Sequence, residues 1–136
     1  MSVLHRLAAP VAVAGACAGA CAAVFWADPT TPGGPIPVCP TRGLFGVWCP
    51  GCGSSRMVYA LLHGDLPAAL RFNAVGVVAL AVLAYTLAVW VSRRARNATG
   101  PWWYEARWAP QLVLAVVLAW FVIRNIPAEP FTSLRV

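Results

Sequence analysis

The chain has 136 residues, of which 60% are hydrophobic and only 10% are charged, and its net charge is +6. Soluble domains carry roughly a quarter charged residues, so this composition excludes an ordinary soluble domain and favours a single membrane domain over residues 1–136. All ten basic residues are arginines spread along the chain beside apolar segments, which indicates membrane anchoring rather than binding of nucleic acid.

Three apolar segments qualify as membrane-spanning helices. A helix needs about 20 apolar residues to cross a bilayer core of ~30 Å, and residues 7–26 and 72–91 meet this requirement without a charge. Residues 108–123 are fewer, but they lie between Arg107 and Arg124, whose side chains can reach the interfaces. The sequence therefore predicts an all-α integral membrane protein with three transmembrane helices.

The first predicted helix, residues 7–26, is rich in small side chains. Gly15 and Gly19 form a small-xxx-small face, which lets another helix approach closely. We expect this helix to contact a second copy of the chain or another membrane protein, while the same glycines also fit a composition rich in Gly and Ala. Cys17 and Cys21, one turn apart, are expected to pack as small residues.

The arginines also predict the orientation. The short connector 92–107 contains four arginines and an aromatic cluster, and short arginine-rich connectors face the cytoplasm. This rule places the N-terminus, with Arg6, in the cytoplasm as well. The connector 28–71 and the C-terminus are then expected on the outer side of the membrane, opposite to the cytoplasm.

The outer connector begins with an extended loop and continues with short helical segments. Residues 28–41 contain five prolines and two glycines, which predicts a loop. Residues 54–63 have the composition of a helix that Ser54 or Ser55 caps. At about 15 Å this helix is too short to cross a bilayer, so we expect it at the interface or as a re-entrant piece.

The end of that short helix and the start of the next element carry their own signals. Gly64 can end the helix, and Asp65 is the predicted N-cap of a following segment in which Pro67 is tolerated near the start. This segment leads into the second span. The outer connector is therefore predicted to hold one or two short interfacial or re-entrant helices.

Three cysteines fall on the outer connector, at positions 39, 49 and 52. A structural zinc site needs four ligands, and His63 would lie about 13 Å from Cys52 along an intervening helix. A redox pair is a second interpretation, because a helix N-terminus after Cys52 and the nearby Arg56 both favour a thiolate. The leading interpretation is a structural disulfide that joins Cys39 to Cys49 or Cys52.

Polar side chains near the apolar segments form a second group of candidates. Arg56, Asp65 and Asn73 are each polar and close to an apolar run. Such residues pair with one another or with backbone, or they lie at the headgroups. Pairing of Asp65 with Arg56 or Arg124 would attach the outer connector to the helices.

Several short motifs together are similar to a family of small bacterial membrane proteins, the domain of unknown function 2752. They are CP at 39–40, CPGCGSSR at 49–56, LLHGD at 61–65, ALRFN at 69–73, and RNIP with a following PF at 124–131. This chain departs from the family pattern at Ser55, where Thr is usual, and at Ala74, where Pro is usual.

The resemblance implies a multi-pass helical protein of the bacterial cytoplasmic membrane and implies no activity. It also directs attention to a shared outer-face cluster, made up of Cys39, Cys49, Cys52, Arg56, Gly64, Asp65, Asn73, Arg124 and Asn125. From the residues and the resemblance together, we expect a non-enzymatic membrane component or assembly partner in contact with the lipid bilayer. We predict no catalytic residue, no metal, no cofactor and no nucleic-acid partner, with a thiol-redox protein or a cysteine-based metal site as the alternatives.

Overall fold

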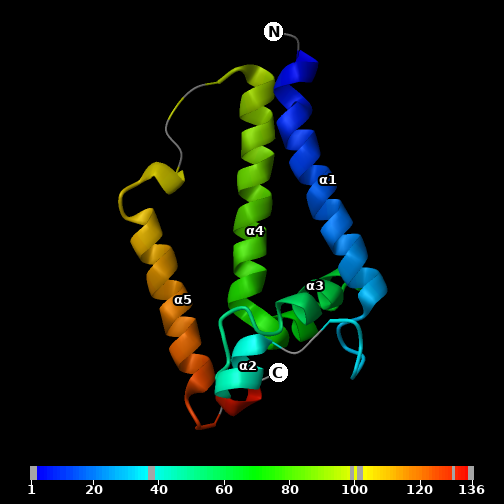
Figure 1. Ribbon diagram of the computed structural model, residues 1–136. Coiled ribbons are helices and arrows are strands. Elements are labelled where there is room, and N and C mark those ends of the chain that lie inside the picture. The colour runs from blue at the N-terminus through cyan, green and yellow to red at the C-terminus, as the bar shows by residue number, and fades with distance from the viewer. Residues whose placement is uncertain (1–2, 37–38, 99, 101–102, 130, 135–136) are drawn as a thin grey trace.

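Three long helices form the body of the molecule. The computed structural model describes residues 3–36, 39–98, 100, 103–129 and 131–134, and the described residues contain helices and no strand. The long helices follow one axis, α1 and α5 in one direction and α4 in the other, and the chain ends lie at opposite ends of the molecule (Figure 1). Their bounds are Val3–Ala27 for α1, Leu66–Arg96 for α4 and Ala109–Asn125 for α5.

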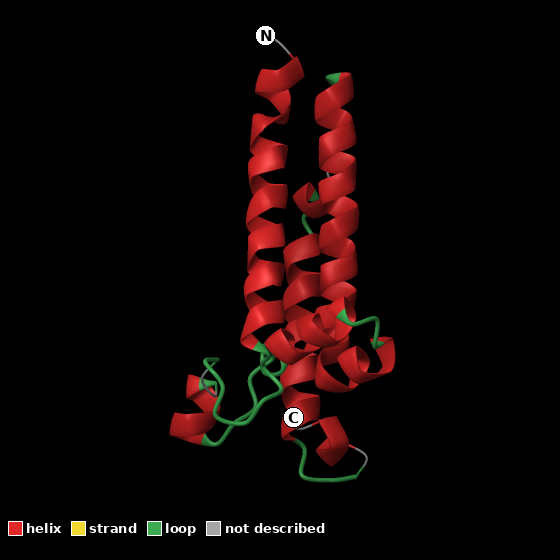
Figure 2. Ribbon diagram, turned by 90° about the vertical axis from the view of Figure 1, so that its right-hand side faces the viewer, coloured by secondary structure: helices red, strands yellow, loops and turns green. Residues whose placement is uncertain are grey.

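Four short elements complete the chain. Three of them gather at the end of the bundle that also holds the C-terminus, as Figure 2 shows from the side. These are α2 (Pro40–Phe45), α3 (Ser54–Leu62) and the 3-10 helix η2 (Phe131–Leu134). The fourth, η1 (Trp103–Glu105), directly precedes the start of α5 (Figure 1).

Two of the long helices have the length and composition needed to cross a membrane, at Leu7–Ala27 and Leu66–Arg96. α5 is also apolar, but its 17 residues extend only about 26 Å at 1.5 Å per residue. The predicted all-α class is confirmed, and the predicted spans 7–26, 72–91 and 108–123 correspond to the three long helices.

Asn73 divides α4 into a short first part and a long apolar part. Its backbone is not helical (φ −163°, ψ 88°), and its side-chain Oδ1 accepts a hydrogen bond from the Gly76 N–H at 2.9 Å. An Asn that bonds the N–H three residues onward is an N-cap. The long apolar part therefore begins at its own cap, and residues 66–72 turn away from it.

Burial in the molecule is concentrated at one end, in a unit that we call the cap: residues 39–73, η2 and the C-terminal end of α5. Met57, Ala60 and Ala69 are its buried core, and neighbouring apolar side chains such as Phe72 and Val77 pack against them. α1 contacts α3 and α4, and the Phe25 ring stacks on the His63 ring at 5.1 Å. Small side chains at positions 60 and 69 let α3 lie close to α4.

The structure corrects part of the predicted local organisation. The loop predicted for residues 28–41 ends early, because Pro40 is in the first turn of α2, an element that the sequence did not predict. Gly53, in a left-handed conformation (φ 80°), occupies the N-cap position of α3 that had been assigned to Ser54 or Ser55. Asp65 is the N-cap of α4 as predicted, since its carboxylate accepts the Ala68 N–H at 2.9 Å.

We expect Gly76→Ala to destabilise the cap by about 1–3 kcal/mol. A Cβ at this position would lie 2.7 Å from Met57 Sδ and 3.0 Å from Asn73 Cγ. Met57 is buried and the Asn73 amide is hydrogen-bonded, so neither group can move away without loss. The control is Gly15→Ala, where the Cβ meets nothing within 4 Å. Denaturant unfolding in detergent micelles measures the stability of both variants. Equal unfolding free energies for Gly76→Ala and Gly15→Ala would contradict the prediction.

Candidate functional site

The segment CPGCG forms a tight turn that leads directly into α3. The Cys52 N–H donates to the Cys49 carbonyl at 3.1 Å, and the Ser54 N–H donates to the Gly51 carbonyl at 3.1 Å. Gly53 then adopts the positive φ that other residues avoid, and this directs the chain into the helix. Both cysteines of the motif are therefore presented by one short, internally hydrogen-bonded piece of backbone.

Cys39 reaches the same place from ten residues upstream. It is the N-cap residue of α2, and its carbonyl accepts the N–H groups of Arg42 and Gly43, each at 3.0 Å. The Sγ atoms of Cys39 and Cys49 are 3.4 Å apart, those of Cys49 and Cys52 are 3.1 Å apart, and all three lie within 4.8 Å of one another. We call these three residues the thiol cluster.

The predicted disulfide is wrong. A disulfide requires two sulfur atoms about 2.05 Å apart, and both short Sγ–Sγ distances exceed this by more than an ångström. Cys39, Cys49 and Cys52 are free thiols, as are Cys17 and Cys21 in α1. The three loop cysteines do come together as expected, but as a cluster of three without a bond.

Asn125, at the end of α5, fixes the residue that precedes the turn. Its Oδ1 accepts the Trp48 N–H at 3.1 Å, and its Nδ2 donates to the Trp48 carbonyl at 2.9 Å. One side-chain amide thus satisfies both polar groups of a backbone unit, as a neighbouring β-strand would. This two-way bond attaches the turn to a helix 77 residues away in the sequence.

Two buried polar side chains hold the turn itself. The Asn73 Nδ2 donates to the Pro50 carbonyl at 2.9 Å and to Ser54 Oγ at 3.1 Å. The Arg124 Nη1 donates to the Cys52 carbonyl at 2.6 Å. Asn73 is 2% exposed and Arg124 is 0% exposed, so both amide and guanidinium are removed from water together with the backbone that they bind.

The two ends of the thiol cluster differ in acidity. A hydrogen bond with Thr41 and further bonds with Cys49 and Cys52 lower the pKa of Cys39 from 9.0 to about 6. Burial, assisted by hydrogen bonds with Cys49 and Cys39, raises the pKa of Cys52 from 9.0 to about 12. The sequence had pointed to Cys52 as the thiolate because it precedes a helix, but the loss of hydration outweighs that effect. Cys39 is therefore the more acidic end of the thiol cluster.

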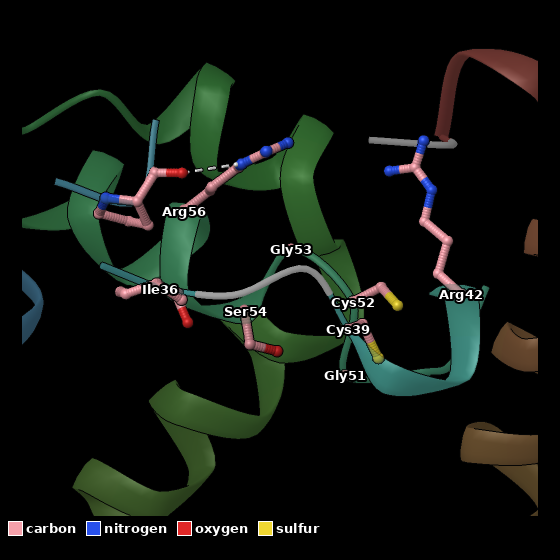
Figure 3. A pocket seen from close by; sticks show the side chains of 10 residues that line it. Ile36, Cys39, Arg42, Gly51, Cys52, Gly53, Ser54 and Arg56 are labelled. Carbon is pink, nitrogen blue, oxygen red and sulfur yellow. Dashed lines mark hydrogen bonds between the residues drawn. The ribbon is translucent and has the colours of Figure 1, made fainter. Parts of the chain in front are cut away.

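A pocket of about 220 Å³ opens beside the thiol cluster. Cys39 and Cys52 line it, and Arg42 and Arg56 stand on opposite sides of the two cysteines (Figure 3). The Arg42 guanidinium stacks 3.9 Å above the Trp48 ring, and Arg56 Nε donates to the Pro29 carbonyl at 3.1 Å. The pocket is smaller than the ~300–1,000 Å³ typical of drug-sized ligands, so it fits water or a small ligand.

Not all of the predicted site residues join this arrangement. Asn73, Arg124 and Asn125 hold the turn, and Arg56 lines the pocket. Asp65 pairs with neither arginine, since its carboxylate caps α4. His63 is the C-cap of α3, where its Nδ1 lies 2.9 Å from the Tyr59 carbonyl oxygen, and it does not join the three grouped thiols.

Two contributors to the site were not identified in the sequence. Thr41 lies two residues after Cys39, with its Oγ1 2.9 Å from the Cys39 Sγ. Trp48 offers its backbone to Asn125 and its ring to Arg42. The signal that could have found Thr41 is its nearness to Cys39 in Cys-Pro-Thr, since a hydroxyl two residues from a thiol can reach its sulfur. The backbone role of Trp48 leaves no such signal.

The family comparison covers the thiol cluster. Residues 39–87 match the model of the family described as "Protein of unknown function (DUF2752)", which confirms the resemblance seen in the motifs. The match contains the whole thiol cluster and Asn73. Arg124 and Asn125 lie beyond it in the sequence but bond to Cys52 and Trp48 within it. No curated protein and no solved structure matches the chain significantly.

We expect Thr41→Val to raise the pKa of Cys39, because the mutation removes the hydroxyl that contributes most to the low pKa. In the reduced wild-type protein, alkylation of Cys39 by iodoacetamide should rise around pH 6, since only the thiolate reacts. In the variant the midpoint should move toward 9. Peptide mass spectrometry at a series of pH values measures this.

Thr31→Val is the matched control for this measurement, because Thr31 bonds to Asp28 and not to a thiol. It should leave the Cys39 profile unchanged. Identical profiles for Thr41→Val and the wild type would show that Thr41 does not set the acidity of Cys39.

Proposed function

We propose that the chain is a three-span integral membrane protein that acts as a non-enzymatic membrane component and assembles with itself or another membrane protein. The observation that carries this proposal is the contrast between a packed cap and exposed apolar helices. Val11, Val78 and Val122, one from each long helix, are 67%, 62% and 57% exposed. Apolar surface on this scale calls for lipid or another protein to cover it.

The lengths of the three helices support three spans in a single membrane domain. α1 has 25 residues, and the part of α4 after Asn73 is of similar length. α5 is a few ångströms shorter than a bilayer core of ~30 Å, a mismatch that local thinning accommodates at small cost. Its N-cap is Trp108, an exposed aromatic residue of the type that anchors helices at the interface.

The orientation follows from charge. The last turn of α4 carries Arg93, Arg94 and Arg96, at the end of the bundle where the N-terminus lies. By the positive-inside rule that end faces the cytoplasm. The cap, with its thiol cluster, then lies at the outer surface of a bacterial cytoplasmic membrane.

α1 offers the surface for assembly. A Cβ added at Gly15 or Gly19 would meet nothing within 4 Å, so the small-residue face points away from the rest of the chain. Helices in a bilayer associate through such faces because the backbones can approach closely. The partner proposed here is a second copy or another membrane helix.

The thiol cluster supports a second candidate, a thiol–disulfide exchange protein. Cys49 Sγ lies within 3.4 Å of both other sulfur atoms, close enough to form a bond after a small movement. Bond formation between Cys49 and Cys52 would pass two electrons and two protons to the disulfide of a partner protein, through a mixed disulfide. Capture of that mixed disulfide in Cys52→Ser, and not in Cys17→Ser, is the result that this candidate requires.

The topology can be tested with two cysteine substitutions in a background whose five natural cysteines are serines. Leu44→Cys lies on the exposed part of the cap, and Ala98→Cys lies after the other end of α4. A membrane-impermeant maleimide should label Leu44→Cys in intact cells and Ala98→Cys only after permeabilisation. The reverse pattern would invert the orientation, and labelling of both from outside would contradict a spanning α4.

The assembly surface predicts the effect of large side chains on α1. We expect Gly15→Leu with Gly19→Leu to weaken self-association by about tenfold or more, which is ~1.4 kcal/mol, while the cap unfolds at the same denaturant concentration. Crosslinking in membranes measures the association. Ala20→Leu is the matched control, because residue 20 is exposed on a different side of the helix. Equal crosslinking of the wild type, the double glycine variant and Ala20→Leu would show that this face is not used for self-association.

A further inference from the structure

We propose that Cys39, Cys49 and Cys52 bind one thiophilic metal ion, with Zn²⁺ as the reference ion. These three side chains are the metal-ligating groups that the described part of the chain brings together, with all three Sγ atoms within 4.8 Å of one another. The sequence alone had predicted no metal, because a structural zinc site needs a fourth protein ligand. The three-dimensional arrangement makes three ligands sufficient for a different kind of site.

The distances between the sulfur atoms favour a shared ion. Zn–S bonds of ~2.3 Å in a tetrahedral arrangement place sulfur atoms about 3.8 Å apart. The Sγ–Sγ distances of 3.4 Å and 3.1 Å lie closer to that value than to the ~2.05 Å of a disulfide. These two separations would lengthen by about 0.4 Å and 0.7 Å to reach the spacing of thiolate ligation.

The backbone of the site is already fixed. Asn125 holds Trp48, Asn73 holds Pro50 and Arg124 holds Cys52, so alternate residues of the turn are hydrogen-bonded from outside it. Little conformational entropy is lost when an ion joins side chains on an ordered backbone. Partners of this kind around metal ligands typically account for a 10–100-fold difference in affinity.

The charges balance when the ion is present. Three thiolates and one divalent ion carry a net charge of −1, which is costly to keep away from water unless a cation is near. Arg124 is fully buried, bonds the Cys52 carbonyl, and interacts electrostatically with the thiols of Cys52 and Cys49. The guanidinium supplies the +1 charge that neutralises the complex, and arginine keeps this charge in proteins.

The fourth position of the ion belongs to a small ligand rather than to the protein. His63 lies at the far end of α3 and packs against Phe25. Cys39 and Cys52 line the pocket of about 220 Å³, which gives water or a small ligand access to the cluster. Three protein ligands with one open position are typical of zinc sites that exchange ligands, whereas closed sites of four are structural.

The test uses the full-length protein, purified in detergent, reduced and kept without oxygen. Titration with Co²⁺, which replaces Zn²⁺ and reports thiolate ligation by charge-transfer absorption, should saturate at one ion per chain. Zn²⁺ should displace the Co²⁺ and remove the absorption. In the loaded protein the three cluster cysteines should resist alkylation, while Cys17 and Cys21 react as before.

Single replacements of the cluster identify the ligands. Cys39→Ser, Cys49→Ser and Cys52→Ser should each weaken Co²⁺ binding by more than ~100-fold, beyond the effect of losing an outer partner. The double variant Cys17→Ser with Cys21→Ser is the control and should bind like the wild type. Asn125→Ala keeps all thiols and should weaken binding by about tenfold. Helical circular dichroism checks that each variant is folded.

Two results would overturn the metal site. One is a folded, reduced wild-type protein that shows no thiolate charge transfer with Co²⁺. The other is Co²⁺ binding that survives all three cluster replacements. Neither result affects the proposed membrane topology or the assembly through α1, which are measured by labelling and crosslinking.

Discussion

The structure depends on one buried cation that gathers backbone carbonyls from three parts of the chain. Arg124 donates to Cys52 in the turn, to Phe72 at the break of α4, and to Leu134 in η2. Each of these carbonyls would otherwise need water or a helical partner, and hydrogen bonds from a charged donor are worth more than neutral ones. Arg124 thereby connects the end of α5 to the turn, to α4 and to the C-terminal segment.

Around this cation the protein divides into two regions with different physics. The cap is stabilised by side chains that bind backbone, and its apolar core is small, centred on Met57, Ala60 and Ala69. Outside the cap, the apolar stretches of the long helices contain few buried side chains and rely on their surroundings. A polar network can position thiols with accuracy because hydrogen bonds are directional, whereas packing of apolar helices in lipid is not. The division explains why the chemistry-bearing residues and the exposed apolar residues occupy different parts of the molecule.

Much of this could be predicted from the sequence. Apolar segment lengths gave the long helices, and Asp65 and Pro67 marked the start of α4. Spacing and motif resemblance gathered the cysteines, Asn73, Arg124 and Asn125 into one group.

The errors have physical causes. A disulfide was expected because cysteines near one another in an outer loop normally pair, but here three thiols converge and the closest sulfur atoms are still 3.1 Å apart. Cys52 was expected to be acidic from its place before a helix, and only the structure shows that its burial decides the pKa.

The position of α5 has a mechanical consequence for the cap. Among the described residues, α5 packs mainly against η1 at its start and η2 at its end, and Figure 1 shows it set apart from α4 along its length. Its last two residues are Arg124 and Asn125, which donate hydrogen bonds to the Cys52 and Trp48 carbonyls of the cysteine turn. α5 is therefore attached to the turn through its end, while most of its length has few neighbours in the described part of the chain. If α5 spans the membrane as proposed above, a change in its tilt would shift the two side chains that position the turn, and with it the spacing of the three thiols.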